Sequence, residues 1–181
     1  MVLAEDETDL LLFPPLRAGW SKRGAAAEVR VSGRNAKRVV FGAMNLRTGH
    51  RLLVTRAKGR GADFRAFLAA VRRDYRGWHV ALLLDEDSCH TAGDSVRAAA
   101  GMTLLWLPNR APELNPMDTL WGQAKDVIRA NQQSDDIDGQ AARFVAHVYG
   151  LSNHEALRTS GVLPKAFWLR DVLSRKFCPP A

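Results

Sequence analysis

The sequence lacks an apolar run long enough to cross a membrane. Its longest candidate, Val80–Leu84, has the length of a buried strand, whereas a membrane-spanning helix needs roughly 20 apolar residues. The N-terminal residues also lack the basic segment that opens a secretory signal peptide. We therefore expect no membrane partner and no secretion signal in this chain.

Cysteine is also scarce. The two cysteines, Cys89 and Cys178, are far apart in the 181 residues, so they form neither a disulfide framework nor a paired set of metal ligands. Such a chain suits a reducing compartment, and we expect it to act in the cytoplasm.

Negative charge is in deficit, with 26 lysines and arginines against 19 acids and a formal net charge of +7. Most of the excess is arginine, whose guanidinium binds phosphate groups in a bidentate manner. A nucleic-acid partner is consistent with this charge. A high-GC coding sequence would produce the same arginine bias, so charge alone leaves both interpretations open.

The apolar pattern alternates between strands and helices through the first two thirds of the chain. Period-two and continuous apolar runs predict strands at residues 2–12, 37–45, 51–55, 78–84 and 103–107. Apolar stripes at helical spacing predict helices at residues 62–75, 95–100 and 115–130. This order predicts an α/β fold with a mixed sheet and flanking helices. The loop between the first two strands holds Trp20, which we expect to be a buried anchor.

From Ser134 onward the pattern is helical only. An apolar stripe predicts a helix that ends at Gly150, and Ser152 with Glu155 forms a capping-box pattern for a second one. A third helix is predicted at residues 164–176. We therefore divide the chain into a sheet domain, residues 1–131, and a C-terminal helical extension, residues 132–181, that packs on it.

The opening strand carries a run of acids between Glu5 and Asp9. Acids are depleted in strands, so this run needs an explanation. Strand alternation places Asp6 on one face and Glu5, Glu7 and Asp9 on the other, so at most one set can face a bound metal ion. The alternative explanation is a solvated edge strand.

Two further acids lie at the ends of predicted elements. Asp85 directly follows the apolar strand, at the carboxyl edge where α/β sheets bind their ligands, although aspartate is also a common turn residue. Asp118 lies in the first turn of a helix that Asn115 caps and Pro116 opens. The helix dipole favours a charged Asp118, which suits a metal ligand as well as a simple helix cap.

These acids belong to a longer set of motifs, namely Asp6-Glu7, Trp20, Gly24, Asp85-Glu86, His90, Leu107-Pro108, Ala111-Pro112, Leu114-Asn115-Pro116, Asp118 and Trp121. The set resembles the mariner-like DDE/DDD transposases of bacterial insertion sequences. The resemblance spans residues 1–131 and is most specific between Asp85 and Lys125. Two positions depart from the family pattern, with Glu86 in place of an asparagine and Asp118 in place of the commoner glutamate.

The resemblance implies an RNase H-like catalytic domain over residues 1–131. It implies that Asp6, Asp85 and Asp118 are the catalytic residues and hold two Mg²⁺ or Mn²⁺ ions. Hard divalent cations prefer carboxylate oxygens, and two ions roughly 4 Å apart can activate an attacking oxygen and stabilise a leaving one. The implied reaction is cleavage of DNA phosphodiester bonds, followed by transfer of 3′-hydroxyl DNA ends to target DNA.

Five other residues are candidates for support of the site or for DNA contact: Glu7, Glu86, His90, Arg110 and Lys125. His90 could orient a metal-bound water or touch a DNA phosphate, or be an ordinary polar histidine in a loop. Arg110 lies in a loop that should border the site. Lys125 could contact phosphate or be an exposed helical lysine, and Trp121 is expected in the core because it lies on the apolar helix face.

The resemblance also implies partners. Relatives bind transposon ends and target DNA and act as dimers, so we expect a homodimer in a bacterial cytoplasm beside the nucleoid. No helix-turn-helix segment precedes the first strand, and we expect another chain to supply one if this chain is a fragment, a split-frame product or a domesticated protein. The competing hypothesis is a non-catalytic DNA-binding or assembly domain derived from a transposase, which the three retained acids disfavour. An RNase H-like ribonuclease is disfavoured by the helix start at Leu114-Asn115-Pro116.

Overall fold

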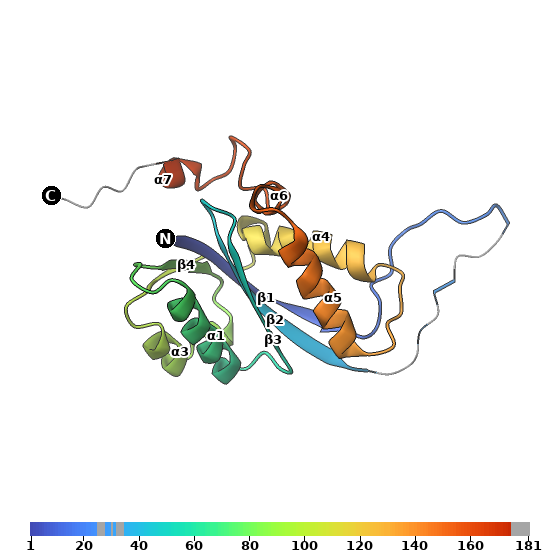
Figure 1. Ribbon diagram of the computed structural model, residues 1–181, viewed down its shortest axis with the longest axis horizontal. Coiled ribbons are helices and arrows are strands. Elements are labelled where there is room, and N and C mark those ends of the chain that lie inside the picture. The colour runs from blue at the N-terminus through green and yellow to red at the C-terminus, as the bar shows by residue number, and fades with distance from the viewer. Residues whose placement is uncertain (25–27, 30, 32–34, 175–181) are drawn as a thin grey trace.

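A computed structural model describes residues 1–24, 28, 29, 31 and 35–174. Its centre is a five-stranded sheet in the order β3-β2-β1-β4-β5 (Figure 1). The central strand β1 is antiparallel to β2 and parallel to β4, which confirms the predicted mixed sheet. Because β1 lies in the middle, its acids do not belong to a solvated edge strand. The strands are β1 Val2–Leu11, β2 Lys37–Asn45, β3 Arg51–Arg56, β4 Ala81–Leu84 and β5 Thr103–Trp106.

Helices cover both faces of the sheet (Figure 1). Helix α1 packs on one face, and α4, α5 and α6 share a core on the other. Within the described residues, every helix is too short or too polar to span a bilayer. The helices are α1 Gly61–Asp74, α2 Ser88–Thr91, α3 Gly93–Ala98, η1 Pro112–Leu114, α4 Pro116–Arg129, α5 Ile137–Gly150, α6 Asn153–Thr159 and α7 Arg170–Ser174.

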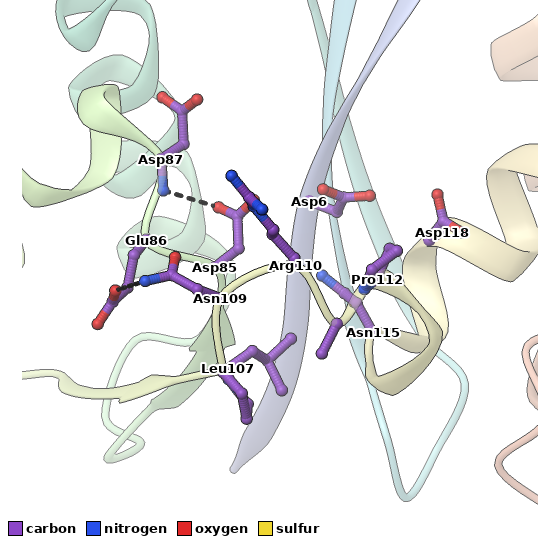
Figure 2. A pocket seen from close by; sticks show the side chains of 12 residues that line it. Asp6, Asp85, Glu86, Asp87, Leu107, Asn109, Arg110, Pro112, Asn115 and Asp118 are labelled. Atoms are coloured by element: carbon purple, nitrogen blue, oxygen red, sulfur yellow. Dashed lines mark hydrogen bonds between the residues drawn. The ribbon is translucent and has the colours of Figure 1, made fainter.

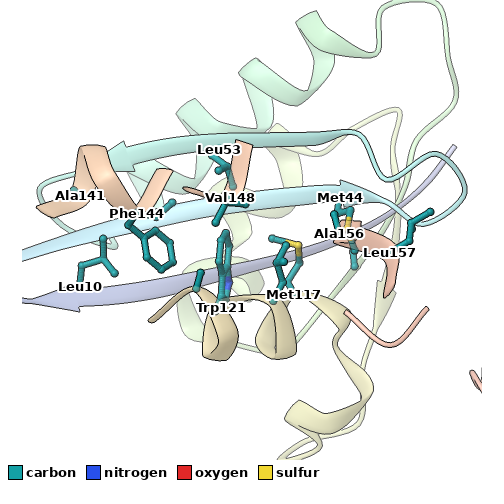
Figure 3. Close-up of a cluster of buried hydrophobic side chains, with 14 of the residues drawn as sticks. Leu10, Met44, Leu53, Met117, Trp121, Ala141, Phe144, Val148, Ala156 and Leu157 are labelled. Carbon is teal, nitrogen blue, oxygen red and sulfur yellow. The ribbon is translucent and has the colours of Figure 1, made fainter. Parts of the chain in front are cut away.

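Strand alternation divides the core into two layers. In β2, Val40 faces α4 and α5, whereas Phe41 faces α1, where it stacks on Phe67 with ring centroids 5.8 Å apart. On the other face, Trp121 packs against Phe144 with centroids 5.7 Å apart (Figure 3). Each such side chain contributes about 1.5–3 kcal/mol when it is fully buried. Trp121 is therefore a core residue, as expected.

One glycine allows α4 to lie directly on the sheet. Gly42 of β2 pairs with Asp6 of β1. A methyl group at Gly42 would lie 2.5 Å from the Trp121 ring and 2.8 Å from the end of Met117. Since Met117 and Trp121 flank Asp118 in α4, this close approach sets how near Asp118 comes to Asp6.

Helices α5 and α6 complete the same core as α4. The side chains that these helices bury in this core include Phe144 and Val148 of α5 and Leu157 of α6 (Figure 3). Arg51 connects β3 to the residue after α5 by hydrogen bonds. Its guanidinium donates to the carbonyl oxygen of Leu151 and also to that of Gly49. The expected packing of the C-terminal helices on the sheet is thus present, while the boundary at residue 131 stays a prediction.

Several predicted elements differ in the structure. Trp20 is fully exposed rather than a buried anchor. Strand β4 begins at Ala81 rather than at Trp78, which follows a turn at Gly77 with a φ of 83°. The third C-terminal helix reduces to α7, because residues 164–170 form successive single turns; Lys176, its expected end, lies outside the described residues. Helix α2 was not predicted.

Candidate metal centre

Three elements bring the three predicted ligands to one pocket. The parallel register pairs Ala4 of β1 with Leu83 of β4, so two residues further along each strand Asp6 lies beside Asp85. Asp118 reaches the same place from the first turn of α4. Together they line a pocket of about 300 Å³ (Figure 2).

Asn115 fixes the start of α4 beside β1. Its side-chain oxygen accepts a hydrogen bond from the Met117 N–H at 3.1 Å and so caps the helix. Its side-chain nitrogen donates to the Glu5 carbonyl oxygen at 2.8 Å. Glu5 directly precedes Asp6 in β1. Asn115 therefore connects the start of α4, which carries Asp118, to the strand segment that carries Asp6. Helix capping is therefore supplied by Asn115, and the Asp118 side chain is exposed at the pocket.

The clustered carboxylates repel one another. Burial, followed by the charges of Glu7, Asp85 and Asp118, raises the pKa of Asp6 to about 8. A divalent cation would relieve this repulsion, and an all-oxygen donor set suits Mg²⁺ or Mn²⁺. The oxygens of Asp6, Asp85 and Asp118 do not all lie within 4.8 Å of one another. That spread agrees with ions that take only a few protein ligands and fill the rest with water and phosphate.

Asp85 is held by two donors on one oxygen. Its Oδ1 accepts from the Asp87 backbone N–H at 3.1 Å (Figure 2) and contacts His90 Nδ1 at 2.9 Å. His90 is only 1 % exposed. It is therefore neither an ordinary polar loop histidine nor accessible to a DNA phosphate, because α2 folds it inward against α1.

The other ring nitrogen of His90 faces acids of β1. Its Nε2 lies 3.1 Å from Glu7 Oε2 and 3.6 Å from Glu5 Oε2. Both are ion-pair contacts without hydrogen-bond geometry. Burial would lower the pKa of His90, but close contacts with Cys89 and Glu7 and the charges of Glu5 and Glu7 raise it to about 12. Glu5 and Glu7, on the face opposite Asp6, thus meet a histidine, whereas Asp9 pairs with Lys37.

The remaining candidates border the pocket in different ways. Glu86 accepts a hydrogen bond from the Asn109 side chain at 2.9 Å (Figure 2). Arg110 lines the pocket with a φ of 59°, a left-handed conformation that costs a non-glycine residue about 1–2 kcal/mol. Lys125 is half-buried rather than exposed, and burial and the charge of Arg129 lower its pKa.

A second hollow adjoins the first. It has a volume of about 540 Å³ and shares Asp6 and Asp118 with the first pocket. Lys37 and Lys125 also line it. The acids therefore lie where two hollows meet, and lysine side chains reach one of them.

Sequence reasoning missed three contributors to this site. Asn115 was recognised as a helix cap, but not as a donor to β1. Asp87 both supports Asp85 and caps α2, through the Cys89 N–H at 2.7 Å; its position two residues after Asp85 was the available signal. Glu5 was considered only as an alternative to Asp6, and no local pattern shows that it is completely buried.

The family of this chain follows from its match to a protein-family model. The model of the DDE superfamily endonuclease family matches residues 1–139. The chain belongs to this family. The match covers both strands and the helix that carry the three acids, so the resemblance inferred from the motifs is confirmed.

Curated relatives of this endonuclease-family chain come from bacteria. The insertion element IS630 uncharacterized 39 kDa protein of Shigella sonnei is 27 % identical over 136 residues, which are 73 % of this chain and 40 % of that protein. The uncharacterized protein y4pE/y4sA of Sinorhizobium fredii (strain NBRC 101917 / NGR234) is 34 % identical over 62 residues, 34 % of this chain and 45 % of that protein. The chain thus spans less than half the length of the curated relatives it matches.

Solved structures confirm the RNase H-like fold. The pre-cleavage Mos1 transpososome matches with a TM-score of 0.71 and 16 % identity over 98 % of this chain and 57 % of that one. The catalytic domain of Mos1 mariner transposase matches with a TM-score of 0.61 and 15 % identity, covering 90 % of this chain and 76 % of that one. At this identity the likeness concerns the fold.

Proposed function

We propose that this chain is the catalytic domain of a metal-dependent transposase that cuts DNA and joins the freed 3′-hydroxyl ends to target DNA. Asp6, Asp85 and Asp118 are the catalytic residues and hold two Mg²⁺ or Mn²⁺ ions. One observation carries the proposal: three carboxylates from β1, β4 and α4 converge on one pocket, where their mutual repulsion contributes to the raised pKa of Asp6. Such crowding weakens a fold unless a cation compensates it.

The bound ions would activate the attacking oxygen and stabilise the leaving oxygen of an in-line displacement. The protein supplies the frame for this chemistry. Asp85 Oδ1 is engaged by Asp87 and His90, which leaves Oδ2 out of these bonds and free for the pocket. Arg110 at the pocket and Lys125 at the adjoining hollow are cations suited to hold the phosphates on either side of the cleaved bond.

Related proteins support DNA as the substrate. Mos1 transposase has been solved as a paired-end complex with the left transposon end and as paired-end complexes with Mn or Mg. We therefore extend transposon ends and target DNA to this chain as partners, together with a homodimer. The enzyme would act beside the bacterial nucleoid.

The test is cleavage of a labelled DNA duplex with Mn²⁺ or Mg²⁺. The wild type should cut only with metal, and Asp85→Asn should abolish cutting while Asp135→Asn, a change at an exposed acid outside the pocket, should not. Melting temperature with and without Mn²⁺ is measured in parallel, because a ligand that binds only the folded state stabilises it.

The other outcomes separate the competing hypotheses. Absence of both cutting and a Mn²⁺-dependent rise in melting temperature would overturn the enzyme proposal in favour of a DNA-binding or assembly domain. A rise in melting temperature without cutting, lost in Asp85→Asn, would show an intact metal site that needs its DNA-reading partner for activity.

A further inference from the structure

A second group of ionisable side chains lies behind the metal pocket. It consists of Glu5 and Glu7 on β1 and of Cys89 and His90 on α2. Glu5 is 0 % exposed and His90 1 %. Both Glu5 carboxylate oxygens and His90 Nε2 are buried without a hydrogen-bond partner. The proposed chemistry uses none of these groups directly, yet burying them is costly.

His90 connects this group to the pocket. Its Nδ1 lies 2.9 Å from Asp85 Oδ1, and its Nε2 lies 3.1 Å from Glu7 Oε2. The ring also packs on Phe64 of α1 with centroids 4.4 Å apart. One imidazole therefore bridges the acids of β1 and the acid that follows β4.

The structure assigns His90 a positioning role: we propose that it locks the Asp85 carboxylate in the orientation needed to bind metal, using Glu7 on β1 as its anchor. This inference rests on the proposed function of Asp85 as a ligand. The anchor strand also carries Asp6, so the contact places two of the three ligands in one rigid frame.

The need for such a lock follows from the position of Asp85. Its side chain is 55 % exposed and lies just beyond the end of β4. The last torsion of an aspartate side chain is broad, so an exposed carboxylate rotates easily. Donors from Asp87 and His90 both engage Oδ1. This fixes the carboxylate plane and directs Oδ2 away from both donors.

A competing explanation is that the buried group itself holds an ion. Ligand atoms of Glu7, Cys89 and His90 lie within 4.8 Å of one another. Burial, however, raises the pKa of the Cys89 thiol to about 11, whereas metal binding requires the thiolate. Cys89→Ala distinguishes the two explanations, because only direct binding depends on the sulfur.

The experiment exploits the two ends of the imidazole. Asparagine places an amide nitrogen where Nδ1 lies, and glutamine places one near Nε2. His90→Asn therefore keeps a donor for Asp85, whereas His90→Gln keeps only the contact with Glu7. The dissociation constant of Mn²⁺ is measured by calorimetry for the wild type, Asp85→Asn and the His90 variants, alongside the melting temperature without metal.

We expect His90→Ala and His90→Gln to weaken Mn²⁺ binding roughly 10–100-fold, the range for loss of a group that orients a metal ligand, and His90→Asn to recover most of that loss. Ser95→Ala is the matched structural control, because Ser95 is buried and donates to the Cys89 carbonyl oxygen at 2.6 Å. It should lower the melting temperature but leave Mn²⁺ affinity near that of the wild type.

Three results would overturn the proposal. The first is equal Mn²⁺ affinity in His90→Asn and His90→Gln. The second is His90 variants that lose stability but bind Mn²⁺ like Ser95→Ala. The third is a Cys89→Ala variant that loses affinity as strongly as His90→Ala, which would make the buried group a metal site. If Asp85→Asn itself binds Mn²⁺ like the wild type, the proposed function fails, and the role of His90 fails with it.

Discussion

The two faces of β1 carry carboxylates with different means of charge compensation. On one face, Asp6 shares a solvent-accessible pocket with Asp85 and Asp118; among the described residues Asp6 and Asp118 have no ion-pair partner, and Asp85 contacts only His90, which lies behind the pocket. On the other face, Glu7 and the buried Glu5 meet the ring of His90. One face therefore needs an ion from solution, while the other has a cation built into the fold.

This difference shows how a single strand can hold both a reactive site and its support. Alternation turns neighbouring side chains of β1 to opposite faces. Burial and the neighbouring carboxylates raise the pKa of Asp6, so either a proton or a bound cation relieves the repulsion there. Glu7 instead anchors His90, which contacts Asp85 from behind the site. Substitutions that change one face at a time can therefore separate binding of metal from orientation of its ligands.

The largest effect on cleavage should come from the pocket face of β1, the face that carries Asp6. Asp6→Asn removes one ligand, and we expect cleavage to fall by a factor on the order of 10² or more, beyond the roughly 10–100-fold typical of a supporting group. The same change should stabilise the metal-free protein. Asp6 has a folded pKa of about 8, well above the usual value of about 3.9. Folding thus takes up a proton between about pH 4 and 8, and stability falls as pH rises through that window.

Cleavage assays and melting curves in EDTA at pH 5 and pH 9 check both parts. The stability gain of Asp6→Asn should be larger at pH 9 than at pH 5, because the folded wild type is charged at Asp6 only at the higher pH. A variant that cuts DNA like the wild type, or that is less stable at pH 9, would contradict this assignment of Asp6.

A change in packing should displace Asp118 at the pocket without altering any carboxylate. Gly42→Ala places a methyl group 2.5 Å from the Trp121 ring, so α4 must move away from the sheet and take Asp118 with it. We expect a loss of about 1–3 kcal/mol in the free energy of unfolding, the usual cost of overpacking. Cleavage should fall more than stability alone explains.

Gly122→Ala provides the matched control for this packing change. Gly122 lies in the same helix, and a methyl group there meets nothing within 4 Å. That variant should gain up to about 1 kcal/mol from helix propensity and keep the wild-type cleavage rate. Denaturant unfolding and cleavage rates are measured for both variants. Equal behaviour of the two would mean that the contact at Gly42 does not set the position of α4.

Much of the pocket face could be predicted from the sequence, because local signals place its acids. The alternation in β1, the apolar strand before Asp85 and the Asn115-Pro116 helix start are local signals, and each places its acid in the correct element. The two strands predicted at residues 37–45 and 51–55 are β2 and β3, which pair with each other. What brings Asp6 and Asp85 together is the parallel register of β1 and β4, and what adds Asp118 is the packing of α4 on the sheet; no local pattern specified either contact.

Other features could not be predicted from local signals, because they depend on contacts between distant segments. His90 looks like a loop residue until α2 forms and packs it on Phe64. Gly42 shows no special pattern, and its role appears only when α4 lies on it. Trp20 was misassigned because a tryptophan in a loop is often an anchor, whereas here its side chain is fully exposed.

The smallest effect should come from the inner face of β1, the face that carries Glu5 and Glu7, where Glu5→Gln removes an ionisable carboxyl but keeps its shape. Burial, opposed by the charge of His90, raises the pKa of Glu5 well above its usual value. A raised carboxyl pKa means that the folded protein holds a proton that the unfolded chain has lost, so Glu5 lowers stability above the unfolded pKa of about 4.3. We expect Glu5→Gln to raise the melting temperature at pH 7 by a few degrees, which corresponds to about 1 kcal/mol in a domain of this size. The gain should shrink toward pH 4, where the unfolded carboxyl is also protonated.

Melting curves of the metal-free protein between pH 4 and pH 7 measure this gain. A lower melting temperature at pH 7 would instead mean that Glu5 is ionised and stabilised by His90, and that the inner face keeps both of its acids charged.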